Sequence, residues 1–190
     1  MKCYKEIKTK YYPKVTWTQP TLTTNGTMGG SSFAVSTTCE VNVSSAWKAF
    51  DGSTSTYGYC YFNAPNNNKG DYILYNPKPI NITQLTINLY IVTQVTVYYS
   101  DDGKTFTQCG YLSRGSTWGQ ATVVVNVDTG NTFHKYYKIY FNNTAGVSQP
   151  QIYDIKITAV EEAYEEEKIT YKLPTKVLGQ DKLTYYGIGD

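Results

Sequence analysis

Charged residues are scarce in this chain, and their scarcity excludes several kinds of partner. They make up 17% of the 190 residues, and the formal net charge is +2. No dense block of Lys and Arg is present that could follow a phosphate backbone, so we expect no nucleic-acid binding. No segment approaches the roughly 20 consecutive apolar residues of a membrane-spanning helix, so we expect no membrane insertion.

Residue patterns that support catalysis are also missing. His134 is the single histidine, and no acid–nucleophile pattern surrounds it. Most acidic residues fall in turns or near the C-terminus, rather than in a pattern that places two carboxylates across one cleft. The four cysteines are too widely spaced for a CxxC metal or redox motif. We therefore expect no enzymatic activity.

The N-terminal segment lacks the apolar core of a secretion signal. Residues 1–14 are rich in Lys and Tyr, but no apolar h-region follows these charges. We expect a protein without a signal peptide.

Tyrosine is abundant, and the apolar residues alternate with polar ones. Tyr occurs 20 times, and Thr, Asn and Ser are also frequent, a mixture that favours strands joined by polar turns. Alternation with a period of two recurs at residues 85–91, 95–99, 121–127, 137–141 and 153–157. Helical periodicity is missing before the acidic tail, so the sequence predicts an all-β fold with two packed antiparallel sheets.

The chain divides into three zones of different composition. Residues 1–14 read as an N-terminal arm that ends near Pro13, and residues 15–160 read as the β-sandwich domain. Residues 161–190 begin with an acidic run, which is interpreted as a short helix or a solvated linker, and continue as a C-terminal arm. Binding residues are expected on the long end loops, at residues 52–70, 113–120 and 142–149.

Several motifs follow one another in the order found in a known family. Residues 45–56 read SAWKAFDGSTST, residues 70–76 read GDYILYN, and residues 95–106 read VTVYYSDDGKTF. The closing strands are expected at residues 136–141 and 152–157. Together these segments resemble the discoidin domain, which includes the C-type domains of coagulation factors V and VIII and galactose-binding modules. The resemblance implies a jelly-roll β-sandwich of the galactose-binding-domain-like kind, flanked here by extended N- and C-terminal arms.

The stretch that precedes these motifs narrows the comparison. Residues 17–20 and 25–36 resemble the lead-in to such domains in tail, fibre and decoration proteins of bacteriophage and prophage virions. The resemblance implies a virion protein that assembles in the bacterial host cytoplasm. Its expected partners are a cell-surface glycan and other virion proteins, which the terminal arms contact, and we expect a homo-oligomer.

The Asp-Gly turn is a candidate metal site, because many carbohydrate-binding members of the family hold a structural calcium ion there. The resemblance implies a calcium site formed by Asp51, Ser53, Thr56 and Asp154, together with main-chain oxygens. Ser53 stands where the family often has Asp or Asn, and Asp154 replaces the usual Glu. The alternative is that Asp51 caps its own turn by accepting backbone N–H bonds.

Candidate ligand residues combine aromatic rings with planar hydrogen-bonding groups. Sugar C–H faces stack on aromatic rings, and sugar hydroxyls bond to amides and Arg. Relatives often have Trp where this chain has Gly58, so neighbouring tyrosines are expected to take that role. The predicted ligand-binding residues are Tyr57, Tyr59, Asn67, Arg114, Trp118 and Asn143. For any one tyrosine, packing in the core or between subunits is the alternative.

Three functions remain open from the sequence. The first is a non-catalytic virion protein whose sandwich binds host-surface carbohydrate. The second is a virion decoration or adaptor protein with no glycan ligand. The third is a bacterial carbohydrate-binding module.

Overall fold

The computed structural model describes most of the chain as two separate units. The described residues are 4–11, 14–38, 43–59, 69–115, 119–143, 150–162 and 165–172. One unit is Lys14–Glu162, and the other combines Met1–Pro13 with Ala163–Asp190. Each unit is treated below by itself.

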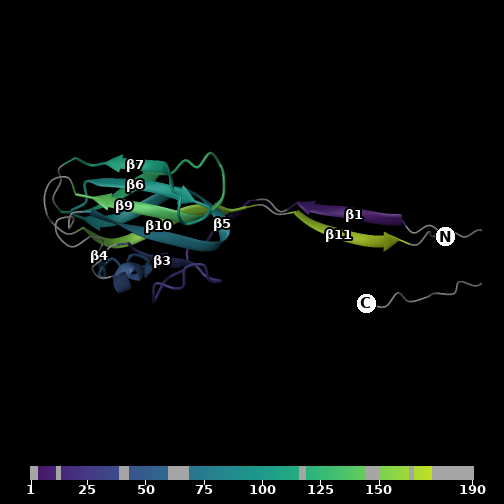
Figure 1. Cartoon of the computed structure of the whole chain (residues 1–190), viewed down its shortest axis with the longest axis horizontal. Coiled ribbons are helices and arrows are strands. Elements are labelled where there is room, and N and C mark those ends of the chain that lie inside the picture. The colour runs from purple at the N-terminus through teal and green to yellow at the C-terminus, as the bar shows by residue number, and fades with distance from the viewer. Residues whose placement is uncertain are drawn as a thin grey trace, which may run out of the picture. The chain divides into compact units, whose positions relative to one another are not determined.

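The larger unit is built almost entirely from antiparallel strands (Figure 1). Its elements are β2 (Val15–Thr16), β3 (Ala34–Ser36), the 3-10 helix η1 (Val43–Phe50), β4 (Gly58–Tyr59), β5 (Lys69–Tyr90), β6 (Gln94–Ser100), β7 (Thr107–Ser113), β8 (Gln120–Asn126), β9 (His134–Asn142) and β10 (Gln151–Glu161). No helix in the described part of the chain is long and apolar enough to cross a membrane.

Strand β5 passes from one layer of a sandwich into the other. Its residues 69–75 pair with β9 and β3, whereas residues 80–90 pair mainly with β10 and β8. The register shifts between these halves, where Pro77 and Pro79 lack the N–H that a ladder needs. The predicted two-layer sandwich is confirmed, but β5 joins both layers into one hydrogen-bonded sheet, and the separate strands expected at residues 70–76 and 85–91 are one strand.

Each layer has a simple strand order. One layer runs β3–β5–β9–β6–β7, and the other runs β2–β10–β5–β8, with β4 also paired to β10. The predicted alternation holds along β5, because Leu85, Ile87 and Leu89 are fully buried whereas Thr86 and Asn88 are partly exposed. Burying each such aliphatic side chain contributes roughly 1.5–3 kcal/mol. The core therefore lies between the layers.

A row of aromatic rings connects the N-terminal part of the sandwich to its core. Trp17 packs edge-on against Phe33, with ring centroids 5.5 Å apart, and Phe33 packs in the same way against Phe50 at 5.8 Å. Phe50 contacts Tyr72 of β5 at 6.4 Å, and Tyr72 packs edge-on against Phe141 of β9 at 5.7 Å. These contacts hold residues 17–33 and η1 against the strands.

The turn between β6 and β7 is closed by the carboxylate of Asp102. Its Oδ1 accepts hydrogen bonds from the N–H groups of Lys104 and Thr105, each at 2.8 Å, and from the Ser100 hydroxyl at 2.9 Å. Gly103 follows with a φ of +70°, a conformation that glycine adopts without steric cost. The hairpin predicted from the Asp-Gly pair is confirmed by the antiparallel pairing of β6 with β7.

The smaller unit contains a two-stranded antiparallel sheet. Strand β1 (Tyr4–Tyr11) pairs with β11 (Glu165–Lys172), and the register places Lys10 opposite Glu166. The interpretation of the acidic run as a helix or a solvated linker is therefore wrong from Glu165 onwards. Its strand partner lies at the other end of the chain, and local sequence does not indicate such a partner.

The hydrogen bonds of Asp102 predict how the stability of the protein depends on pH in acid. Hydrogen bonds from the backbone of Thr105 and Lys104 and from Ser100 lower the pKa of Asp102 from 3.8 to about 2. Because the folded-state pKa lies below the unfolded-state value, the stabilisation is present above pH 3.8 and is lost as the pH falls through about 2. An NMR titration of the carboxyl carbon should therefore show an inflection near 2, and an inflection near the ordinary value would contradict these hydrogen bonds.

Candidate functional site

The pairing of strands brings several predicted loops to one end of the sandwich. The end of β5, at Tyr90, is opposite the starts of β8 and β10, at Gln120 and Gln151. The start of β6, at Gln94, is opposite the ends of β7 and β9. These strand ends lie at the left of the sandwich in Figure 1. We call the described segments there, residues 91–93, 113–115 and 142–143, the loop end.

Arg114 is held in place at the loop end. Its Nη1 donates a hydrogen bond of 3.0 Å to the Val92 carbonyl, and its backbone N–H donates one of 2.7 Å to the Thr93 carbonyl. Thr93 in turn donates from its N–H and its hydroxyl to the Asn142 carbonyl, at 2.9 and 3.1 Å. A guanidinium carries several N–H groups in a planar fork. The Val92 contact therefore orients the fork, and the side chain remains half-exposed.

Asn143 directly follows this network, so the structure brings two predicted ligand residues to the same end. Its side chain is buried, with 1% of its surface exposed. The neighbouring Asn142 uses its side-chain amide to donate a 3.1 Å hydrogen bond to Gln94. Of the two predicted residues, Arg114 is therefore the one presented to solvent.

Tyr57 is engaged in packing. Its ring lies 5.2 Å from that of Tyr153 on β10, at an interplanar angle of 56°, and its side chain is half-buried. This contact matches the packing alternative for the tyrosines. It leaves only part of the Tyr57 ring for a ligand.

Three predicted ligand side chains lie outside the described residues. The backbone of Tyr59 belongs to β4 and is opposite Gln151, at the start of β10. The side chain of Tyr59, and the whole of Asn67 and Trp118, fall outside the described part.

The Asp-Gly turn is closed by the side chain of Asp51. Its Oδ1 accepts a 2.8 Å hydrogen bond from the Ser53 N–H, and its Oδ2 accepts one of 2.6 Å from the Thr56 hydroxyl. The Ser53 hydroxyl lies 2.8 Å from that of Ser55. The capping contact expected of Asp51 is thus present, and the turn also brings the predicted metal ligand Thr56 to the carboxylate.

Asp154, the fourth predicted metal residue, lies on β10. Its carboxyl is buried, and the nearest basic group in the described chain is the exposed Lys156, with Nζ 3.9 Å from Oδ2. Burial raises the pKa of Asp154, the charge of Lys156 opposes this, and the negative charge of Asp51 raises it further. The charge of Asp51 thus adds to the unfavourable environment of the ionised Asp154 carboxyl, and a cation beside them would offset this.

The oxygen atoms at this turn are of the chemical types that calcium binds. Calcium takes several oxygen ligands from carboxylates, hydroxyls, carbonyls and water. The described residues contain no cluster of three or more His, Cys, Asp or Glu. The ligands of a calcium ion here would thus be two carboxylates and neutral oxygens.

His134 makes a local network that the sequence did not indicate. It is buried, its Nδ1 lies 2.8 Å from Asp101 Oδ1, its Nε2 lies 2.7 Å from the Thr132 hydroxyl, and its ring stacks on Tyr99 at 3.9 Å. The Thr132 hydroxyl also lies 2.5 Å from the Thr129 carbonyl, which can only accept a hydrogen bond. The Thr129 carbonyl thus competes with the imidazole for the Thr132 hydroxyl proton.

The backbone of the sandwich is similar to solved carbohydrate-binding modules. The family 32 module of NanJ from Clostridium perfringens, in complex with galactose, matches with a TM-score of 0.51 and 15% identity, over 68% of this chain and 93% of that chain. The chain has the galactose-binding-like β-sandwich fold. The predicted resemblance to discoidin-type modules is thus confirmed at the level of fold.

A second similarity is to part of a much larger enzyme. A family 89 glycoside hydrolase from Clostridium perfringens, in complex with 2-acetamido-1,2-dideoxynojirmycin, matches with a TM-score of 0.50 and 18% identity over 68% of this chain. The match spans only 14% of that hydrolase. No protein-family model and no curated protein matches the sequence. Because one fold carries many functions, the function has to be argued from the site.

Proposed function

We propose that the sandwich is a non-catalytic carbohydrate-binding module that holds a glycan at its loop end. The observation that carries this proposal is the fixed position of Arg114, which bonds to Val92 and Thr93, while Thr93 is itself bonded to the end of β9. A similar module from another protein was solved with galactose. That likeness supports the ligand class.

The chemistry of the loop end suits a polyhydroxylated ligand. A guanidinium held in one orientation donates paired hydrogen bonds to neighbouring sugar hydroxyls without losing further side-chain freedom on binding. The exposed part of Tyr57 offers an aromatic surface for a sugar C–H face, and Tyr59, Asn67 and Trp118 are proposed to complete the contacts. The buried Asn143 is proposed to support the loop from below and not to touch the sugar.

A non-catalytic role is supported by the likeness to a family 32 carbohydrate-binding module, of which the match covers 93%. His134 lies at the start of β9, at the other end of that strand from Asn142, and its partners are structural. A module with one such site gains from being present in many linked copies, because the high effective concentration of sites raises the overall avidity for a glycan surface.

Calcium is proposed to bind between the carboxylates of Asp51 and Asp154, with Thr56 and main-chain oxygens as further ligands and Ser53 close by. What supports this is the raised pKa of the buried Asp154 carboxyl and the contribution of Asp51 to it. The ion would stabilise the turn before β4 and would not contact the glycan.

A place in a bacteriophage virion is proposed for the whole chain, with the terminal strands as the contact to further copies or other virion proteins. A two-stranded sheet such as β1–β11 is marginal in water unless it packs on something else. This need for a partner supports a homo-oligomer. A decoration protein without a glycan ligand, or a bacterial carbohydrate-binding module, are the alternatives.

The glycan proposal predicts a loss of binding when the planar fork of Arg114 is removed. Arg114→Lys keeps the charge but not the fork, so its affinity for galactose should fall about tenfold or more, with an unchanged melting temperature. Isothermal titration calorimetry measures this, and Lys104→Ala, in the exposed turn after β6, is the control. Equal binding by Arg114→Lys and the unmodified protein would contradict the role of Arg114, and no saturable binding of galactose or of any glycan on an array would contradict the function.

The calcium proposal predicts how Asp154→Asn changes the stability of the protein without calcium and with it. In a chelator at neutral pH, Asp154→Asn should raise the free energy of unfolding, because a carboxyl with a raised folded-state pKa loses its stabilising contribution as the pH rises through that pKa. Added calcium should stabilise the unmodified protein and leave Asp154→Asn unchanged. Thermal denaturation measures both, with the exposed Glu162→Gln as control. Equal stabilisation of both proteins by calcium would rule out this site.

The virion proposal predicts self-association that depends on the β1–β11 pairing. Mass photometry of the full chain should show a trimer or larger assembly. Ile169→Pro removes a backbone donor from β11, opposite Ile7, and should shift the population to monomer, whereas Ile169→Val keeps the strand and should not. A full chain that stays monomeric at all concentrations would count against the oligomer.

A further inference from the structure

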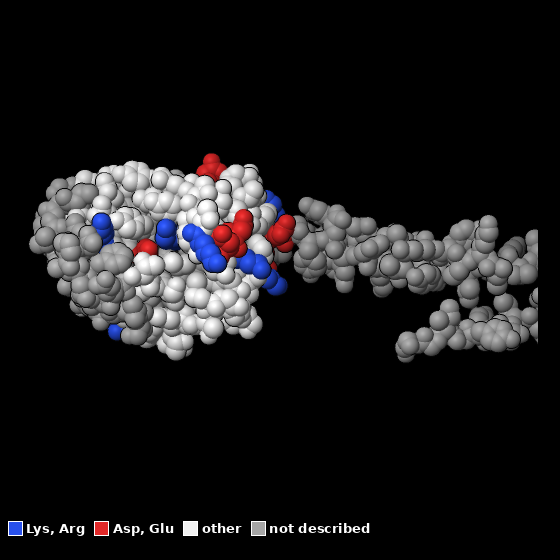
Figure 2. All heavy atoms as spheres, viewed as in Figure 1, with Lys and Arg blue, Asp and Glu red and all other residues white. Residues whose placement is uncertain are grey.

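One long segment of the sandwich has no charge at all. Residues 15–38 contain no Lys, Arg, Asp, Glu or His and are rich in Thr and Ser. The side of the sandwich that carries η1 and β3, at the bottom in Figure 1, is mostly free of charged side chains in Figure 2. This neutral surface contains a pocket that the proposed glycan site does not use.

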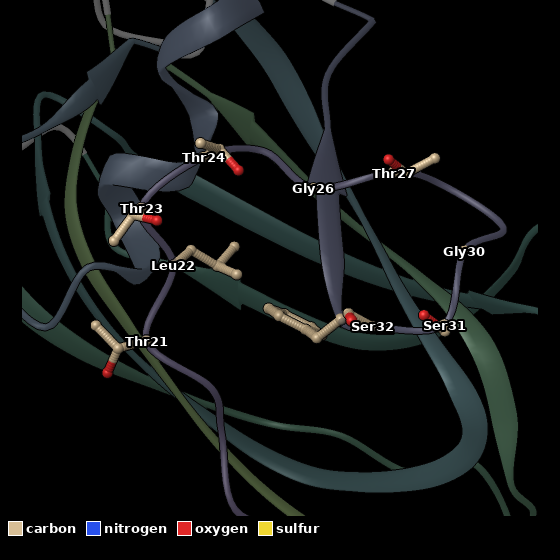
Figure 3. A pocket seen from close by; sticks show the side chains of 10 residues that line it. Thr21, Leu22, Thr23, Thr24, Gly26, Thr27, Gly30, Ser31 and Ser32 are labelled. Carbon is tan, nitrogen blue, oxygen red and sulfur yellow. The ribbon is translucent and has the colours of Figure 1, made fainter.

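The pocket has a volume of about 550 Å³ and lies between two stretches of this segment (Figure 3). Its lining residues are Thr21, Leu22, Thr23, Thr24, Gly26, Thr27, Gly30, Ser31, Ser32 and Phe33. Figure 3 shows the side chains of Leu22 and Thr24 directed towards the stretch that carries Thr27 and Ser31. Leu22 and Phe33 are buried, whereas most of the hydroxyl-bearing residues are exposed. The pocket therefore has an apolar base and a hydroxyl-rich rim.

Both walls of the pocket are fixed to the sandwich. The Leu22 N–H donates a 2.9 Å hydrogen bond to the Phe50 carbonyl at the end of η1. On the other wall, the Gly30 N–H donates to the Thr27 carbonyl at 3.0 Å, and the Tyr75 hydroxyl donates to the Gly30 carbonyl at 3.1 Å. A pocket whose walls are already ordered loses little conformational entropy when a ligand enters.

The pocket is distant from the loop end. Lys69, at the start of β5, is opposite Asn142 of the loop end. Tyr75 lies further along β5, and its hydroxyl bonds to Gly30 of the pocket. At the rise of an extended strand, the backbone of Tyr75 is about 20 Å from that of Lys69. A ligand in the pocket would therefore not touch Arg114.

The lining selects for a neutral ligand with many hydroxyls. No lining residue carries a charge that would recognise an anion or a cation. Hydroxyl groups both donate and accept hydrogen bonds, as sugar hydroxyls do, and the side chains of Leu22 and Phe33 match the C–H face of a sugar ring. The volume lies within the range of roughly 300–1,000 Å³ that is usual for small-ligand sites. We propose that this pocket is a second saccharide site, which takes one or two neutral sugar residues independently of the loop end.

The test is an NMR titration of the full, isotope-labelled chain with galactose, glucose and N-acetylglucosamine, and with N-acetylneuraminic acid as the anionic comparison. Saturable shifts are expected for the amides of Thr24, Gly26 and Ser31 with at least one neutral sugar and not with the anionic one. Thr24→Leu combined with Thr27→Leu removes two exposed hydroxyls and narrows the pocket, and should weaken binding there about tenfold or more. Thr16→Leu combined with Thr18→Leu changes two exposed threonines outside the pocket and should have no effect.

The outcomes separate this inference from the function proposed for the loop end. Shifts at the pocket that survive Arg114→Lys and vanish in the Thr24 and Thr27 double variant support a second site. Shifts confined to Thr93 and Gly115 would overturn the second site and leave the loop-end function standing. Shifts confined to the pocket would support the second site and overturn the loop-end function. No saturable shift with any of the sugars would overturn the second site.

Discussion

The continuous pairing of β5 is the constraint on which the rest of the sandwich depends. One half of this strand forms a ladder with β9 and β3, and the other half forms one with β10 and β8. Because one backbone belongs to both layers, the layers cannot slide independently. A register slip of one residue would turn Leu85, Ile87 and Leu89 towards solvent, so burial of these side chains fixes the register.

The position of the candidate glycan site follows from this register. The loop after β5 leads directly into β6, and the ends of β7 and β9 are paired with the start of β6. Arg114 and Asn142 therefore both reach Thr93 through backbone hydrogen bonds, and the Arg114 side chain adds its bond to the Val92 carbonyl. Ile91 adopts a φ of +53°, which is uncommon for a β-branched residue and shows that the surrounding contacts determine the loop's shape.

Local patterns in the sequence predicted most of the strands but not the long-range pairings. Alternating burial along β5 and the Asp-Gly turn after β6 follow from neighbouring residues, and both are confirmed. The continuity of β5 past Pro77 and the pairing of β11 with β1 depend on partners far away in the chain. The same holds for the contact of His134 with Asp101, since the two residues meet only when β9 lies beside β6. The predicted ligand residues were chosen for their sugar-binding chemistry on the expected end loops, and the structure places Arg114 and Asn143 at the same end of the sandwich.

The scarcity of charge determines what kind of recognition this sandwich can perform. At the proposed second site, the neutral pocket lined by residues between 21 and 33 would recognise a sugar only through hydrogen-bond geometry and the fit of C–H surfaces, which are short-range and almost independent of salt. The proposed site at the loop end differs, because it contains the charged Arg114. Among the described residues, no carboxylate lies within ion-pair distance of Arg114. Its guanidinium is thus not already neutralised by a described acidic group. Arg114, which has no acidic partner among the described residues, and the neutral pocket would respond differently to ionic strength. With an acidic sugar as ligand, only binding at Arg114 would contain a screened Coulomb contribution.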